Sequence, residues 1–227
     1  MMKYASYIIK LFLFWLLYFL FNRVVFIFSY INDFSKISFY EIVKIFPYSL
    51  RLDISFIAYL TTILVCLLFI NSLFSNKRFN KTISYFILLI NILFIFLTAF
   101  IMVGEISLYG EWETKLNFKA LQHLSKPSEV LSTATFLNYI YLFSYFFIAN
   151  IASIIYLRFI HCYFINKKFN IRSFIFRIIK LPIVLGFLLI LIRGGVQPIP
   201  INLSDSYFSE HLIVNDVSVN PNWNIFQ

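Results

Sequence analysis

Long apolar runs recur along the chain, each about as long as an α-helix must be to cross a lipid bilayer, roughly 20 residues. Five such runs are present: Ile8 to Tyr30, Ile54 to Phe74, Ile83 to Val103, Leu137 to Phe159 and Ile175 to Ile192. None of them shows the alternation of apolar and polar residues that is typical of membrane β-barrels. The pattern predicts an all-α integral membrane protein with five transmembrane helices.

Two of the segments between these runs have amphipathic patterns. From Ile37 to Leu50 apolar and polar residues alternate irregularly, and Pro47 is expected to end a short helix there. Between Glu105 and Ser132 apolar residues are spaced four apart, at Leu108, Trp112, Leu116, Ala120 and Leu124. Both segments are predicted to form amphipathic helices at the extracytoplasmic membrane interface. For the second segment, the alternative is a helix packed on the other spans.

The composition excludes a water-soluble enzyme. Hydrophobic residues make up 61% of the 227 residues and charged residues only 13%, whereas soluble domains carry about 25% charged residues. The mean hydropathy is +0.83. An aromatic content of 21% also excludes a disordered chain, because disordered chains are poor in aromatic residues.

The distribution of charge predicts the orientation in the membrane. If the amino terminus is cytoplasmic, the inner segments hold 11 of the 19 basic residues and no acid, whereas the outer segments hold 8 basic and all 10 acidic residues. Lysine and arginine are enriched on the cytoplasmic side of membrane proteins. We therefore expect a multi-pass protein of the bacterial inner membrane, with a cytoplasmic amino terminus and an extracytoplasmic carboxyl terminus.

Several ionisable residues lie where the spans meet the outer surface: Arg23, Arg51, Asp53, Glu105 and Arg193. Charges that enter a membrane are costly and are usually paired or functional. Arg51 or Arg193 could contact the phosphate of a lipid headgroup, anionic or zwitterionic, while Asp53 and Glu105 orient these cations. The alternative is that Arg51 and Asp53 only mark the start of a helix, where an acid is favoured by the helix dipole.

The chain contains no motif for another chemistry. The nucleotide-binding, zinc-protease, serine-hydrolase and CxxC patterns are all missing, so no catalytic residue, metal ligand or cofactor is predicted. Cys66 and Cys162 lack partners at ligand spacing. Nucleic acid is not an expected partner, because the basic residues are dispersed over membrane loops.

The last segment, residues 194–227, is predicted to be an extracytoplasmic connector that follows a membrane domain of residues 1–193. Paired glycines and two X-Pro steps lead the chain away from the last span. The aromatic residues that follow, Tyr207, Phe208, Trp223 and Phe226, indicate that the connector packs against another part of the protein.

The chain resembles the membrane portion of the lipoteichoic acid synthase-like family, in particular its sulfatase-fold members. The resemblance rests on the five-span layout and on four motifs: Arg51-Leu-Asp53-Ile-Ser, Glu105-Ile-Ser-Leu-Tyr109, Arg193-Gly-Gly-Val-Gln-Pro-Ile-Pro-Ile-Asn and Asn220-Pro-Asn-Trp-Asn. It implies a membrane-anchored transferase that moves phosphoglycerol or phosphoethanolamine from a lipid onto an acceptor. The family's chemistry lies in an extracytoplasmic domain with a metal-activated threonine nucleophile, which is expected beyond residue 227.

The resemblance thus implies an anchor and lipid-headgroup platform that is inactive without that catalytic domain, to which any divalent metal would belong. The alternative is a stand-alone, non-enzymatic membrane protein, such as an assembly or lipid-binding subunit. A transporter is disfavoured, because no inverted repeat is evident in the sequence.

Overall fold

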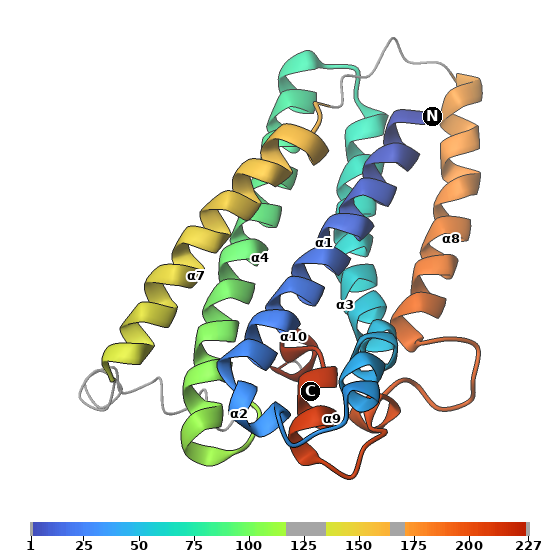
Figure 1. Cartoon of the computed structure of the whole chain (residues 1–227). Coiled ribbons are helices and arrows are strands. Elements are labelled where there is room, and N and C mark those ends of the chain that lie inside the picture. The colour runs from blue at the N-terminus through green and yellow to red at the C-terminus, as the bar shows by residue number, and fades with distance from the viewer. Residues whose placement is uncertain (1, 117–134, 164–170, 226–227) are drawn as a thin grey trace.

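The computed structural model describes residues 2–116, 135–163 and 171–225, and it is built from helices (Figure 1). Five of them are long: α1 (Met2–Ser29), α3 (Phe39–Leu73), α4 (Lys77–Trp112), α7 (Phe136–Ile155), which continues as a π-helical turn over Tyr156–Ile160, and α8 (Ile171–Arg193). Each of the five is long and apolar enough to cross a membrane. The prediction of an all-α, multi-pass membrane protein with five spans is confirmed.

Two helices, α3 and α4, extend well beyond the apolar runs. α3 has 35 residues and α4 has 36, which at 1.5 Å per residue corresponds to roughly 54 Å, against a hydrocarbon core of about 30 Å. Hydropathy finds only the part of a helix that matches the hydrocarbon core. Backbone hydrogen bonding continues past that part for as long as neighbouring elements support it.

The prediction of a separate interfacial helix over Ile37 to Leu50 is wrong. These residues belong largely to α3, whose first turn is capped by the Ser38 side chain, which accepts a hydrogen bond from the Glu41 amide. Pro47 lies inside α3 and does not end it, because the helix is held on both sides of the proline by the buried residues Ile45 and Ser49. A proline removes one backbone hydrogen bond, and packing offsets the loss.

Only the first part of the second predicted interfacial helix lies in the described residues. Glu105 to Trp112 form the last two turns of α4, and Glu113 ends that helix in a left-handed conformation with φ 49°. Residues 117–132 of the predicted helix lie outside the described residues.

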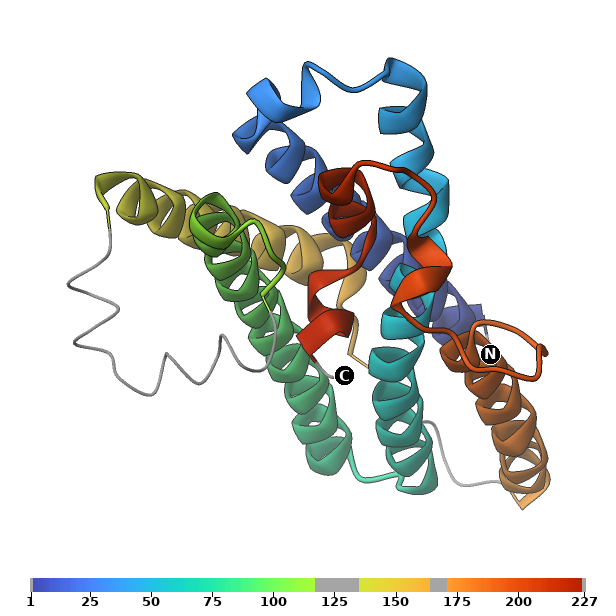
Figure 2. The ribbon, with the colours of Figure 1, turned by 90° about the horizontal axis from the view of Figure 1, so that it is seen from below.

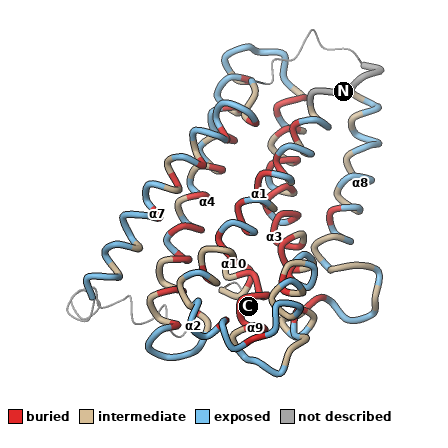
Figure 3. Tube along the Cα trace, in the orientation of Figure 1, coloured by how far each residue is buried: buried red, intermediate tan, exposed pale blue. Residues whose placement is uncertain are grey.

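The bundle has a central group of three helices and two outer ones. α1, α3 and α4 pack together, α7 lies along α4, and α8 lies along α3 (Figures 1 and 2). The core between the central helices includes the fully buried side chains Leu11, Trp15 and Ile57. α7 and α8 are mostly exposed (Figure 3), with large apolar side chains such as Phe147 and Ile183 at the surface, as expected for helices that contact lipid.

The two ends of the bundle differ in charge. We call residues 194–225 the tail, and the end of the bundle where they lie the tail end; the amino terminus lies at the opposite end (Figure 1). In the described ranges, every acidic residue lies toward the tail end, whereas basic residues such as Lys77, Arg78 and Arg177 lie toward the opposite end. This is the asymmetry from which the orientation is predicted.

A glycine pair turns the chain out of α8 and into the tail. Gly194 donates to the Leu191 carbonyl and Gly195 to the Ile190 carbonyl, which is the hydrogen-bond pattern of a Schellman cap. Gly194 has φ +80°, and a Cβ atom there would lie 2.7 Å from Cβ of Ile201. The close approach of Ile201, whose amide donates to the Arg193 carbonyl, brings the tail back against the bundle.

Replacing Gly194 by alanine is therefore expected to lower the free energy of unfolding by about 2–5 kcal/mol, since left-handed strain costs about 1–2 and overpacking about 1–3. Unfolding by SDS in mixed micelles, followed by circular dichroism, measures the change. Gly186→Ala is the control, because a Cβ atom at Gly186 meets nothing within 4 Å and alanine improves helix propensity. Equal midpoints for the two variants would contradict the proposed role of Gly194.

Candidate functional site

The tail folds across the tail end of the bundle as three short helical segments. These are a 3₁₀ turn, η2 (Leu203–Ser206), and two helices, α9 (Leu212–Ser218) and α10 (Pro221–Ile225). They pack against α1, α3 and α4 (Figure 2). Of the aromatic residues expected to pack, Trp223 is buried and donates through Nε1 to Ser55 Oγ at 3.3 Å, whereas Tyr207 is exposed and Phe226 lies outside the described residues. The tail is thus part of the bundle's end surface.

A buried ion pair joins α1 to α3 and to the tail. Arg23 donates to both carboxylate oxygens of Asp53, each at 3.1 Å, and both residues are at least 95% buried. The remaining Nε–H of Arg23 donates to the Val217 carbonyl at 2.9 Å, and Asn220 Nδ2 donates to Asp53 at 2.8 Å. Each charge is therefore paired with an opposite charge and hydrogen-bonded, as buried charges must be. Each of the two side chains is also hydrogen-bonded to the tail.

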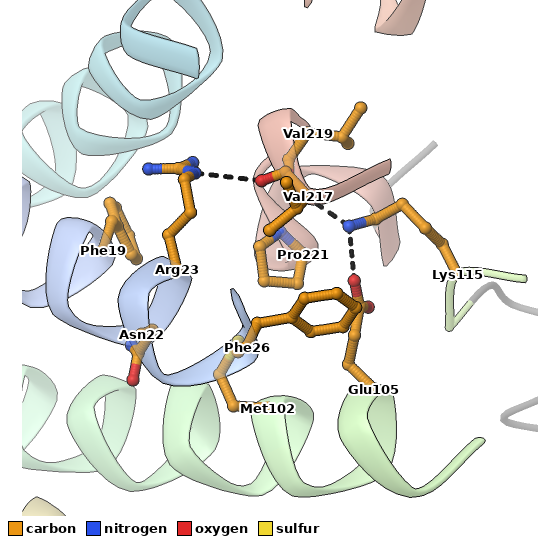
Figure 4. A pocket seen from close by; sticks show the side chains of 10 residues that line it. All are labelled: Phe19, Asn22, Arg23, Phe26, Met102, Glu105, Lys115, Val217, Val219 and Pro221. Atoms are coloured by element: carbon orange, nitrogen blue, oxygen red, sulfur yellow. Dashed lines mark hydrogen bonds and ion pairs between the residues drawn. The ribbon is translucent and has the colours of Figure 1, made fainter. Parts of the chain in front are cut away.

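A second buried ion pair joins the end of α4 to the tail (Figure 4). The Lys115 ammonium contacts the Glu105 carboxylate, and it also donates to the carbonyls of Asp216 at 2.8 Å and Val219 at 3.2 Å. An ammonium group has three N–H donors, and each has a partner here. Tyr109 Oη donates to the Asp216 carboxylate at 3.0 Å. Burial raises the pKa of Asp216, and the nearby Lys115 and the Tyr109 hydrogen bond partly oppose this shift.

A small cavity of about 20 Å³ lies between the two ion pairs, next to Arg23, Glu105 and Lys115, and its other walls are mostly apolar (Figure 4). The side-chain amide of Asn22, buried beside it, forms no hydrogen bond within the described residues, and neither does Oε2 of Glu105. A space of this size accommodates about one water molecule. It is too small for a substrate, and the hydrogen bonds of the ionic network attach the tail to the bundle.

The four residues predicted to contact a headgroup divide into two pairs. Asp53 and Glu105 are buried in the network, whereas Arg51 and Arg193 lie nearer the surface, beside the start of the tail. Arg51 donates to Asp205 at 3.0 Å and to Gln197 Oε1 at 3.1 Å, and Arg193 donates to the carbonyls of Gln197 and Pro198.

The expectation that Asp53 and Glu105 orient Arg51 and Arg193 is therefore wrong. Each acid instead pairs with a different cation, Arg23 or Lys115, which packing brings closer. The alternative, that Asp53 marks a helix start, is wrong too, because α3 begins at Phe39 and Asp53 lies well inside it.

Sequence reasoning missed two tail residues of the network, Asp216 and Asn220, together with the role of Lys115. It also missed Asp205, the tail residue that pairs with Arg51. Lys115 has the spacing of a helical partner for Glu111, but α4 ends before it, and the turn at Glu113 directs it back to Glu105. The motif Asn220-Pro-Asn-Trp-Asn was the one feature of the sequence that could have indicated a role for Asn220. The Asn220 side chain donates to Asp53 and accepts hydrogen bonds from the amides of Asn222 and Trp223.

A much larger cavity, of about 840 Å³, lies between α3, α4, α8 and the tail. Phe56 and Trp223 line its inner part, whereas Tyr59, Ile63 and Leu189 also reach the bundle surface, where they are about half exposed. Among the lining residues in the described ranges, Arg193 alone is charged. We call this space the tail-end cavity. Its volume falls within the range of small-molecule sites, roughly 300–1,000 Å³.

No set of three or more histidine, cysteine, aspartate or glutamate side chains in the described residues could hold a metal ion. Comparisons of the chain with protein-family models, with curated proteins and with solved structures find no match.

Proposed function

We propose that this chain is a membrane domain that binds a phospholipid in the tail-end cavity and presents the lipid headgroup at its extracytoplasmic surface. The observation that carries the proposal is the cavity itself: about 840 Å³, apolar walls that reach the lipid-facing surface, and one cation, Arg193, among the described lining residues. Such a site suits a molecule with an apolar chain and a phosphate group. The predicted orientation places this end of the bundle outside the cell.

The position of Arg193 supports a headgroup contact. It is the last residue of α8, and its guanidinium is held over the start of the tail by bonds to the Gln197 and Pro198 carbonyls. A guanidinium has five N–H donors in a plane and binds phosphate oxygens well. Arg51, in contrast, is already paired with Asp205, so Arg193 is the better candidate of the two predicted cations.

The resemblance to the lipoteichoic acid synthase-like family extends the proposal. In that setting the bound lipid would be the donor of phosphoglycerol or phosphoethanolamine, and a sulfatase-like domain with its metal would lie beyond the tail. Anchoring both partners to one membrane raises their effective concentration. The second candidate remains a stand-alone lipid-binding or assembly protein, for which the same cavity would serve.

Lipid binding is tested by native mass spectrometry of the purified protein, titrated with phosphatidylglycerol and phosphatidylethanolamine. Ile63→Trp fills the cavity and is expected to weaken binding of both lipids about tenfold, or about 1.4 kcal/mol. Ile70→Trp is the matched control, since Ile70 lies on the same helix with similar exposure and is not among the lining residues. Arg193→Gln is expected to weaken binding about fivefold, because one cation near a headgroup contributes about 1 kcal/mol. Undiminished binding by Ile63→Trp would overturn the proposal.

The transferase part is tested separately, by reading the DNA that follows codon 227 in the three forward frames. A sulfatase-like domain with a threonine nucleophile and metal ligands would support it. Unrelated sequence would contradict it and favour the stand-alone protein, whatever the result of the lipid titration.

A further inference from the structure

A second groove, of about 560 Å³, lies at the other end of the bundle between α1, α3 and α8. Its walls are mostly apolar and include Ile8, Leu68 and Val184, whereas Arg177 and Lys180 from the first turns of α8 provide two cations. We call it the basic groove. α3 and α8 pack against each other through Ala58, Val65 and Leu188, and Val65 also lines the groove.

Arg177 is held in place by the end of α3. Its Nη1 donates to the Ser72 carbonyl, one residue before α3 ends at Leu73. The last four carbonyls of a helix lack partners within the helix and carry the negative end of the helix dipole, so they attract a cation. This contact uses one of the five guanidinium donors and keeps the guanidinium at the groove.

The charge around the groove determines what can occupy it. In the described part of the chain no acidic residue lies at this end of the bundle, and the exposed Lys77 and Arg78 begin α4 there. An anionic group is therefore attracted to the groove, and no carboxylate from the described residues competes for its two cations. Apolar walls at the lipid-facing surface favour a ligand that also carries acyl chains.

We infer that the basic groove is a binding site for an anionic glycerophospholipid, whose phosphate contacts Arg177 and Lys180 and whose acyl chains lie against α1, α3 and α8. With the predicted orientation this lipid belongs to the inner leaflet. The site is separate from the tail-end cavity and does not depend on the function proposed for that cavity.

The test compares the binding of dioleoyl phosphatidylglycerol, dioleoyl phosphatidylcholine and inorganic phosphate by native mass spectrometry. It uses the detergent-purified protein with Ile63→Trp, which fills the tail-end cavity, so that lipid bound there does not contribute. Phosphatidylglycerol should bind roughly 10- to 30-fold more tightly than phosphatidylcholine, since each cation near an anionic headgroup contributes about 1 kcal/mol. The double variant Arg177→Gln/Lys180→Gln should lose this preference. Val184→Trp should weaken the binding of both lipids, whereas Ile183→Trp, on the exposed neighbour that does not line the groove, should weaken neither.

Two controls separate this site from others. The double variant Lys77→Gln/Arg78→Gln also removes one lysine and one arginine charge, but from exposed positions outside the groove at the same end, and it should keep the preference for phosphatidylglycerol. Loss of the preference in this variant would show a general effect of surface charge and would overturn the inference. Arg193→Gln should also keep the preference for phosphatidylglycerol, because Arg193 lines the tail-end cavity and not the basic groove. A negative result for lipid binding in one of the two sites therefore does not count against the other. Equal affinity for the two lipids when Arg177 and Lys180 are unchanged and the tail-end cavity is filled, or displacement of phosphatidylglycerol by millimolar phosphate, would likewise overturn the inference.

Discussion

Asp53→Asn is expected to lower the free energy of unfolding by about 3–5 kcal/mol, the usual loss when one partner of a buried ion pair is removed. Asparagine has nearly the same shape and can still accept a hydrogen bond from Asn220 or Arg23. The loss therefore isolates the charge: Arg23, at least 95% buried, would remain a cation without a counter-ion. SDS unfolding in mixed micelles measures the change.

The chain supplies a matched control for this prediction in its second Arg–Asp pair. Arg51 and Asp205 are 3.0 Å apart, close to the 3.1 Å between Arg23 and Asp53, but the Arg51 side chain is 42% exposed. Asp205→Asn is therefore the matched control, because its side-chain oxygen can still accept the Asn202 amide hydrogen bond, and it should cost at most about 1 kcal/mol. Similar losses for Asp53→Asn and Asp205→Asn would show that burial does not decide the strength of these pairs.

A double-mutant cycle measures the pair directly. Arg23→Leu and Asp53→Leu should each be strongly destabilising, and the double variant should be less destabilising than the sum of the two, with an interaction energy of about 2–3 kcal/mol. Simple additivity would contradict direct coupling between the two side chains.

Lys115→Met should release the tail from the bundle. Methionine keeps much of the apolar stem but removes the Lys115 donor from three acceptors: the Glu105 carboxylate and the carbonyls of Asp216 and Val219. The Asp216 carbonyl keeps one partner, the Val219 amide. An unpaired buried carboxylate again costs about 3–5 kcal/mol, and this loss falls on contacts that hold the tail. The tail should therefore open before the bundle unfolds.

Cysteine labelling detects the opening. Val219 is 99% buried, so a Val219→Cys variant with Cys66 and Cys162 replaced by alanine should react slowly with maleimide. Adding Lys115→Met should raise the labelling rate at least about tenfold if tail opening is favoured by 1.4 kcal/mol or more. Lys36→Met is the control, since Lys36 is exposed at the same end of the bundle. An unchanged rate in the Lys115→Met background would show that other contacts hold the tail.

Both predictions concern the tail because it receives bonds from two ion pairs at once. Arg23 and Asp53 bond to Val217 and Asn220, and Lys115 bonds to Asp216 and Val219. The packed tail in turn supplies Trp223 and Ile201 to the wall of the tail-end cavity. Loss of either ion pair should therefore weaken lipid binding in that cavity as a secondary effect, even though neither pair lines it.

The candidate site was predictable only in part. Arg51, Asp53, Glu105 and Arg193 all lie at the end of the bundle where sequence reasoning expected them, because their places along the spans fix their depth. Their partners were not predictable. Asp53 bonds to Asn220, which is 167 residues away along the chain, and local spacing carries no information about such a contact.

The sequence by itself determined the five spans, because transfer of an apolar run into a bilayer depends on the sum of its residues and not on their neighbours in space. It also determined the separation of acidic from basic residues between the two ends, since helix order alone assigns each residue to an end. Only the tertiary structure decided which cation pairs with each buried acid, that the tail folds back over the bundle, and where the two cavities lie. Burial makes these pairings energetically important, and burial arises only when α1, α3, α4 and the tail pack together.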